Sequence, residues 1–215
     1  MDIEISKIEK REVMIAPSKN EQAMEKYLTG SQFLEENKLN EAESHLKEAI
    51  ALDSLFVDAM DHLGMVYRRQ NRLQEAEEIY LRSIGLNNKN IVSYQNLAAV
   101  YRIQNRLRDA LELYMKMIEI NEYNPEPYYA MGELSFTVEE YENSMKLFDI
   151  AIKLYMESNP LNVFDAFYYK GMIYFKLKKW DEALYWLEAA QKGILPEKVK
   201  ISIKNKIDEI KNKTI

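Results

Sequence analysis

The sequence predicts an all-α fold made of stacked helix pairs, and two observations support this prediction. The stretch YRRQNRLQEA at residues 67–76 returns as YRIQNRLRDA at residues 101–110, an offset of 34 residues. Only six glycines and five prolines interrupt the 215-residue chain, and its apolar residues follow helical spacing. A regular period with few helix breakers favours long helices joined by short turns.

Columns of residue types recur in five consecutive segments of the chain. A small residue comes first, an aromatic residue follows three positions later in all but the fourth segment, and a second small residue follows twelve positions after the first. The first small residue is Gly30, Gly64, Ala98, Gly132 or Gly171, and the second is Ala42, Ala76, Ala110, Ser144 or Ala183. Glycine inside a helix costs about 0.5–1 kcal/mol relative to alanine. Its recurrence therefore predicts that two helices approach closely at this position.

Short segments rich in asparagine and basic residues, such as NKL and NRL, separate the two small residues of each segment. Each segment is therefore predicted to be a helix, a tight turn and an antiparallel helix. A single helix pair cannot bury its own apolar face, whereas stacked copies can, which explains why the chain repeats itself.

This pattern resembles the tetratricopeptide repeat family, which shares the period of 34 residues, the order of small and aromatic residues and the helix-turn-helix unit. The resemblance implies a right-handed superhelical solenoid of five repeats over residues 23–197. The expected repeats are 23–56, 57–90, 91–124, 125–158 and 164–197, and Pro160 is expected to open the fifth helix pair. Residues 1–22 are expected to form an N-terminal tail that is either disordered or partly helical.

Residues 198–215 are predicted to form a C-terminal capping helix, because a solenoid needs a polar-backed end. Its apolar stripe consists of Val199, Ile203, Ile207 and Ile210. A basic helix that binds nucleic acid is the alternative interpretation of this lysine-rich segment. The interleaved acidic residues Glu197, Asp208 and Glu209 disfavour that alternative.

Composition argues against several classes of function. The chain has no cysteine, which excludes disulfides and thiol chemistry and fits a reducing compartment. No signal peptide and no membrane-spanning apolar run is present, so we predict a cytoplasmic protein that does not bind membranes. The net charge of −6 argues against non-specific attraction to nucleic acid.

The sequence contains no pattern specific to an enzyme, a metal site or a cofactor. The two histidines, His45 and His62, lie on different predicted helices and are interpreted as packing or surface residues. Neighbouring acidic residues such as Glu77 and Glu78 point about 100 degrees apart on a helix and do not form an acid-base pair. We therefore predict a non-catalytic protein without a cofactor.

The family resemblance implies that a partner binds in a concave groove lined by the first helices of the pairs. The candidate groove residues are Tyr27, His62, Met65, Arg68, Arg69, Gln95, Asn96, Arg102, Tyr129, Glu133, Phe136, Tyr168, Tyr169 and Met172. The same groove is expected to include Leu28, Ser31, Asp58, Asp61, Val92, Ala99, Ala130 and Phe175.

Two groups among these residues allow more than one interpretation. Arg68 and Arg102 occupy equivalent positions one repeat apart, where they either grip an acidic or phosphorylated segment of a partner or serve the helix dipole and solubility. Aromatic residues of the last two repeats, such as Tyr129 and Tyr168, form either a groove wall or part of the core between helices.

We therefore predict a protein-interaction module that binds a peptide or helix of an unidentified partner protein. The alternative is a self-associating scaffold, in which the groove or the N-terminal tail, with Ile3, Ile5 and Ile8, contacts a sister chain.

Overall fold

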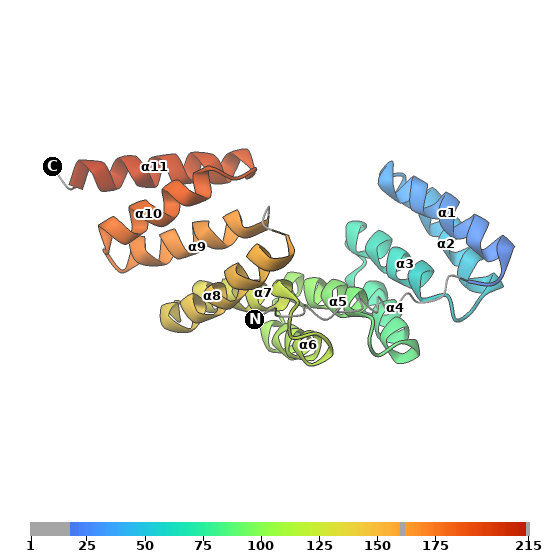
Figure 1. Ribbon diagram of the computed structural model, residues 1–215. Helices are drawn as coiled ribbons and strands as arrows, with labels where there is room; N and C mark the ends of the chain where they lie inside the picture. The colour runs from blue at the N-terminus through green and yellow to red at the C-terminus, as the bar shows by residue number, and fades with distance from the viewer. Residues whose placement is uncertain (1–17, 160–161, 214–215) are drawn as a thin grey trace, which may run out of the picture. The chain divides into compact units, whose positions relative to one another are not determined.

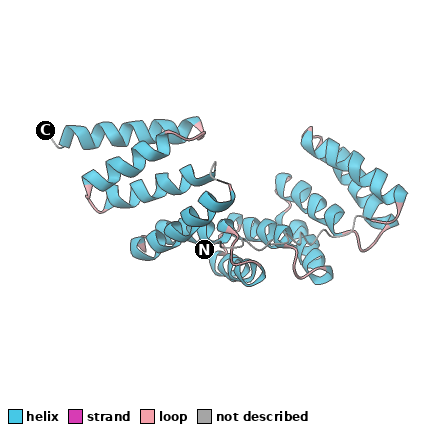
Figure 2. Ribbon diagram, viewed as in Figure 1, coloured by secondary structure: helices cyan, strands magenta, loops and turns pink. Residues whose placement is uncertain are grey.

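The computed structural model describes residues 18–159 and 162–213, which form eleven α-helices and no strand (Figures 1 and 2). The predicted all-α fold class is therefore confirmed. Residues 1–17, with most of the expected tail and with Ile3, Ile5 and Ile8, lie outside the described residues, as does Pro160. The chain divides into an N-terminal unit up to Gln104 and a C-terminal unit from Asn105 onward.

The N-terminal unit contains five helices that pack in sequence order. They are α1 (Glu21–Glu35), α2 (Leu39–Leu52), α3 (Val57–Arg69), α4 (Leu73–Leu86) and α5 (Ile91–Ile103). Each helix packs against the next, and α3 also contacts both α1 and α5. The first helices of successive pairs therefore lie side by side in this unit.

The C-terminal unit contains six helices. They are α6 (Leu107–Ile120), α7 (Pro125–Thr137), α8 (Tyr141–Ser158), α9 (Val163–Lys176), α10 (Trp180–Gln191) and α11 (Glu197–Lys213). Consecutive helices pack together, and α7 also contacts α9. On α11, Ile203, Ile207 and Ile210 are buried in one cluster with Ala183 and Leu187 of α10, so the polar side of this last helix faces solvent.

The turn inside each pair uses a residue in the left-handed conformation. The φ angles are 57° at Asn37, 61° at Asn71, 60° at Asn105, 63° at Glu139 and 59° at Lys178. Asparagine visits this region more readily than other residues with a Cβ atom, because its short polar side chain can form local hydrogen bonds. The asparagines in NKL and NRL are thus explained by backbone geometry.

The recurring glycines stand where two helices touch. A Cβ atom on Gly64 of α3 would lie 2.5 Å from Cε1 of Tyr80 on α4. A Cβ atom on Gly171 of α9 would lie 2.7 Å from Cγ of Leu187 on α10. Both distances are below van der Waals contact, so the predicted close approach is confirmed in both units.

Candidate functional site

Two surfaces carry the residues expected to bind a partner, and each lies on first helices of the pairs in one unit. The N-terminal face, on α1, α3 and α5, comprises Tyr27, His62, Met65, Arg68, Arg69, Gln95, Asn96 and Arg102. The C-terminal face, on α7 and α9, comprises Tyr129, Glu133, Phe136, Tyr168, Tyr169 and Met172. All fourteen residues are at least partly exposed.

Two residues that were expected to face the groove are buried instead. Asp61 is only 3% exposed and Ala130 only 8% exposed, so the prediction is wrong for both. The Asp61 carboxylate accepts hydrogen bonds from Ser83 Oγ at 2.8 Å, Ser93 Oγ at 2.8 Å and Asn90 Nδ2 at 2.7 Å. A carboxylate can be buried only when several hydrogen-bond donors surround it, and these three residues supply them.

The Asp61 cluster joins three helices of the N-terminal unit, since Asp61 lies on α3, Ser83 on α4 and Ser93 on α5, with Asn90 as the N-cap of α5. Burial raises the pKa of Asp61, and the hydrogen bonds from Ser93, Ser83 and Asn90 offset part of this rise. The cluster is therefore a structural element beneath the N-terminal face rather than part of it.

His62 belongs to a small polar and aromatic group on the N-terminal face. Its Nδ1 atom lies 2.7 Å from Ser31 Oγ, and its ring centroid lies 5.0 Å from that of Tyr27. Burial lowers the pKa of His62, while the negative charges of Asp58 and Glu35 act in the opposite direction. The imidazole is therefore neutral at neutral pH and links α3 to α1 through a hydrogen bond.

Arg68 and Arg69, which are neighbours on α3, have different surroundings. Arg69 Nη1 donates to the carbonyl of Leu34 at 2.9 Å, near the C-terminal end of α1. Arg68 is partly buried, and its Nε atom and the hydroxyl of Tyr80 are both buried without a hydrogen-bond partner among the described residues. Burial raises the pKa of Tyr80, and the nearby charge of Arg68 offsets part of this rise.

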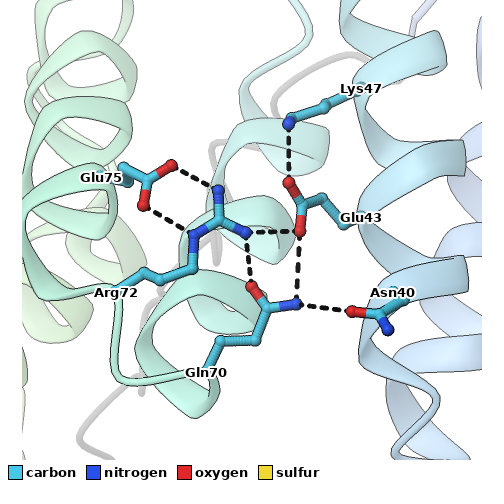
Figure 3. Close-up of polar contacts among 6 residues, drawn as sticks. All are labelled: Asn40, Glu43, Lys47, Gln70, Arg72 and Glu75. Atoms are coloured by element: carbon cyan, nitrogen blue, oxygen red, sulfur yellow. Dashed lines mark hydrogen bonds and ion pairs between the residues drawn. The ribbon is translucent and has the colours of Figure 1, made fainter.

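Arg72 is the centre of a polar network that joins α2 to α4 and the turn before it (Figure 3). Its Nη1 atom donates to Glu43 Oε2 at 2.6 Å and to Gln70 Oε1 at 2.7 Å, and its Nε atom donates to Glu75 Oε2 at 2.6 Å. Lys47 Nζ donates to the other oxygen of Glu43 at 2.6 Å.

Burial alone would raise the pKa of Glu43, but hydrogen bonds from Lys47, Arg72 and Gln70 lower it below its ordinary value. Through its ion pairs with Glu43 and Glu75, Arg72 links the first helix pair to the second. Sequence reasoning missed this network, although Arg72 has basic counterparts at Lys38 and Arg106 in the turns of other pairs.

The C-terminal face is built on aromatic rings. The Tyr169 ring stacks on buried Phe148 at a centroid distance of 5.2 Å and an interplanar angle of 12°. The same ring meets Tyr129 at 6.0 Å, Phe136 at 5.4 Å and Tyr168 at 5.4 Å. Tyr129, Phe136 and Tyr169 pack on the core and remain partly exposed. Their role as a groove wall stays a prediction.

Carboxylates accompany these rings. Tyr169 Oη donates to Glu133 Oε1 at 2.7 Å, and Tyr129 Oη donates to the same oxygen at 3.4 Å. Glu126, one heptad earlier on α7, accepts a hydrogen bond from Tyr155 Oη at 3.0 Å. On α9, burial raises the pKa of Asp165 and the charge of Glu133 raises it further.

The sequence prediction did not include Glu126 and Asp165 in the site. The available signal was the spacing of Glu126 and Glu133, which are seven residues apart and therefore lie on one face of a helix.

Other cations of the C-terminal unit have partners of their own. Lys170 Nζ pairs with Asp149 Oδ1 at 2.5 Å and lies 4.0 Å from the ring centroid of Trp186. Lys206 on α11 pairs with Glu209 at 2.8 Å and lies 4.3 Å from the Phe175 ring centroid. These lysines stabilise the helix packing at the end of the unit.

Family models described as tetratricopeptide repeat match residues 57–122 and residues 129–197. The chain belongs to the tetratricopeptide repeat family. None of the curated proteins compared with the chain matches it.

Solved structures share the fold of this tetratricopeptide repeat protein. A tetratricopeptide repeat protein from Parabacteroides merdae is 21% identical with a TM-score of 0.68, over 87% of this chain and 74% of that one. YrrB, described as a tetratricopeptide repeat protein with an unusual peptide-binding site, is 21% identical with a TM-score of 0.60, over 85% and 92%. PilF of Pseudomonas aeruginosa is 14% identical with a TM-score of 0.73, over 88% and 89%.

Within residues 18–159 and 162–213 of this tetratricopeptide repeat protein, no group of three or more histidine, aspartate or glutamate side chains could hold a metal ion. In the same residues, no helix combines the length and the apolar character needed to cross a membrane.

Proposed function

We propose that this chain is a non-catalytic interaction module that binds a peptide or helix of a partner protein on its first-helix faces. Tetratricopeptide repeat proteins act as protein-interaction scaffolds, and YrrB of the same fold is described as having a peptide-binding site. The observation that carries the proposal is the C-terminal face, where Tyr129, Phe136, Tyr168 and Tyr169 form one connected and partly exposed aromatic surface. Tyrosine and phenylalanine are enriched in protein interfaces.

The N-terminal face supports the more specific proposal of an acidic or phosphorylated partner segment near Arg68. Arg69 is bonded to a carbonyl of α1 and Arg72 to two carboxylates, whereas Arg68 makes no ion pair among the described residues. A partly buried guanidinium binds carboxylate or phosphate more strongly than an exposed one, since water screens it less. Arg102, which is exposed at the equivalent position of α5, is proposed to contribute to the same recognition.

The protein is further proposed to act in the cytoplasm without binding nucleic acid or membranes. The absence of cysteine supports a reducing compartment, and the net charge of −6 disfavours polyanionic partners.

A pull-down with mass spectrometry tests the proposed function. The baits are wild type, Arg68→Glu with Arg102→Glu, and Tyr129→Ala with Tyr168→Ala. Lys89→Glu with Lys153→Glu is the matched control, because both lysines are exposed, lie outside both faces and give the same change of charge. We expect a protein that wild type and control enrich and at least one face variant loses.

Equal recovery with all four baits would contradict binding on these faces. If wild type enriches only itself, and light scattering shows a mass above the 25.4 kDa of one chain, self-association replaces partner binding.

A further inference from the structure

We propose that the C-terminal face binds a lysine- or arginine-bearing segment of the partner, with the cation held between the carboxylates of Glu126, Glu133 and Asp165 beside the tyrosine rings. This inference rests on the proposed function and adds the chemistry of the partner at one of its two faces. The N-terminal face, with Arg68, is the counterpart that takes an acidic segment.

The first support is the fixed position of the Glu133 carboxylate. Two tyrosine hydroxyls, from Tyr169 on α9 and Tyr129 on α7, donate to its Oε1 atom at 2.7 and 3.4 Å. Hydroxyl donors orient a carboxylate, which can accept about four hydrogen bonds in all. The carboxylate is thus held in place on the face beside two aromatic rings.

The second support is a pair of carboxylates that lack cations. Among the described residues, neither Glu126 nor Asp165 forms an ion pair, and Glu126 accepts its hydrogen bond from the neutral hydroxyl of Tyr155. Both are partly buried. Negative charge in a partly buried position is costly, and a cation supplied by a partner relieves that cost.

Contacts through two tyrosines connect Glu126 with Glu133. Tyr155 donates to Glu126, the Tyr155 ring lies 6.3 Å from the Tyr129 ring, and Tyr129 donates to Glu133. The charge of Asp165 acts on both tyrosines as well. Burial raises the pKa of Tyr129, and the charges of Glu133 and Asp165 raise it further. Burial likewise raises the pKa of Tyr155, and Glu126, Asp165 and Glu133 add to the rise. The surface therefore combines negative potential with ring faces.

A cationic side chain matches both properties of this surface. Lysine and arginine bind carboxylates through charge-assisted hydrogen bonds and are attracted to the faces of tyrosine rings. Lys170 and Lys206 of the same unit are each paired with another acid and lie over other rings. The occupant of the face is therefore proposed to come from the partner.

Fluorescence anisotropy at physiological ionic strength tests the proposal on the full chain. The probes are a short labelled peptide that alternates lysine with leucine and alanine, the same peptide with every lysine acetylated, and a counterpart with glutamate in place of lysine. The proteins are wild type, Glu126→Gln with Asp165→Asn, and the control Glu157→Gln with Asp208→Asn. The control makes the same chemical change at two exposed acids outside the face.

We expect the lysine peptide to bind wild type and the control equally, and to bind Glu126→Gln with Asp165→Asn about tenfold more weakly. Acetylation is expected to weaken binding to wild type by a similar factor, which tests the charge without any protein variant. Equal weakening in the control variant, or equal binding of the glutamate peptide, would overturn the proposal.

Adding Glu126→Gln with Asp165→Asn to the pull-down as a fifth bait separates failure of this inference from failure of the proposed function. A partner that is lost with Tyr129→Ala and Tyr168→Ala but kept with Glu126→Gln and Asp165→Asn leaves the proposed function standing and overturns the inference. A partner that is lost with both variants supports both proposals.

Discussion

The two faces of this protein differ in chemistry although the helices beneath them obey the same rules. The N-terminal face presents an imidazole at His62, a guanidinium at Arg68 and amides at Gln95 and Asn96. The C-terminal face presents tyrosine rings with carboxylates among them. Packing fixes the glycine, alanine and aromatic columns, whereas it constrains the partly exposed residues of the faces less.

The interiors beneath the faces differ as well. The N-terminal unit contains a buried carboxylate at Asp61, held by donors from two other helices. In the C-terminal unit, the buried ring of Phe148 stacks against Tyr169 of the face. One unit therefore depends on hydrogen-bond satisfaction beneath its face, and the other depends on ring packing.

The largest effect is expected for Asp61→Ala, which breaks the polar interior of the N-terminal unit. The change removes the carboxylate that accepts from Ser83, Ser93 and Asn90 and leaves only the hydrogen bonds of Ser93 with Ser83 and Asn90. We therefore expect the free energy of unfolding to fall by about 2–4 kcal/mol. Denaturant titration followed by circular dichroism measures this loss. A loss below about 1 kcal/mol would show that the donors find other partners.

The ionisation of Asp61 is expected to make the free energy of unfolding depend on pH. Because the folded pKa is raised above 3.8, the contribution of Asp61 to stability is greatest below pH 3.8 and declines as pH rises through the folded pKa. In Asp61→Asn this decline is expected to disappear. The measurement is the difference in unfolding free energy between wild type and Asp61→Asn across acidic pH, and a constant difference would contradict the prediction.

Glycine substitutions test what the two units share. Gly64→Ala and Gly171→Ala each force a Cβ atom against the partner helix, so we expect each to destabilise the protein by about 1–3 kcal/mol. Gly85→Ala is the matched control, because no atom other than those of its chain neighbours and of its own helix backbone lies within 4 Å of the added Cβ. Gly85→Ala is expected to stabilise by about 0.5–1 kcal/mol. Equal effects at all three positions in thermal unfolding would refute the close-packing explanation.

Glu43→Gln tests the polar network around Arg72 in the N-terminal unit. We expect Glu43→Gln to lower the free energy of unfolding at neutral pH by about 1 kcal/mol. The effect is modest because solvent partly screens the charge of Glu43. The folded pKa of Glu43 is lowered, so this stabilisation is present above pH 4.5 and is lost as pH falls through the folded pKa. Wild type and Glu43→Gln should therefore converge in stability at acidic pH, and a persistent gap would point to packing instead of charge.

The smallest effect is expected at the turns of the C-terminal unit. Glu139 and Lys178 adopt positive φ angles that asparagine accommodates more easily, as at Asn37 and Asn71. Glu139→Asn and Lys178→Asn are each expected to stabilise by about 0.5 kcal/mol. The reverse change, Asn71→Lys, is expected to destabilise by a similar amount, and thermal unfolding of all three variants measures the effect.

Features that recur from repeat to repeat could be predicted from the sequence, whereas contacts that occur in a single repeat could not. Gly64 and Asn71 recur in register, so their roles could be inferred by comparing copies. Asp61 was misplaced because its donors, Ser83 and Ser93, come from two later helices and have no counterpart in a period. The hydrogen bond from Tyr169 to Glu133 likewise depends on how α7 packs against α9, which spacing along the chain does not encode.

The positions of the two tryptophans allow the unfolding of one unit to be followed by intrinsic fluorescence. Trp180 and Trp186 both lie on α10, and the chain has only these two, so intrinsic tryptophan emission reports the C-terminal unit alone. Circular dichroism reports the helices of both units. When the two signals are recorded in one denaturation, their midpoints coincide if the halves unfold cooperatively and separate if each half melts on its own. Because Lys170 Nζ lies 4.0 Å from the centroid of the Trp186 ring, we expect this emission to respond also to changes around Lys170.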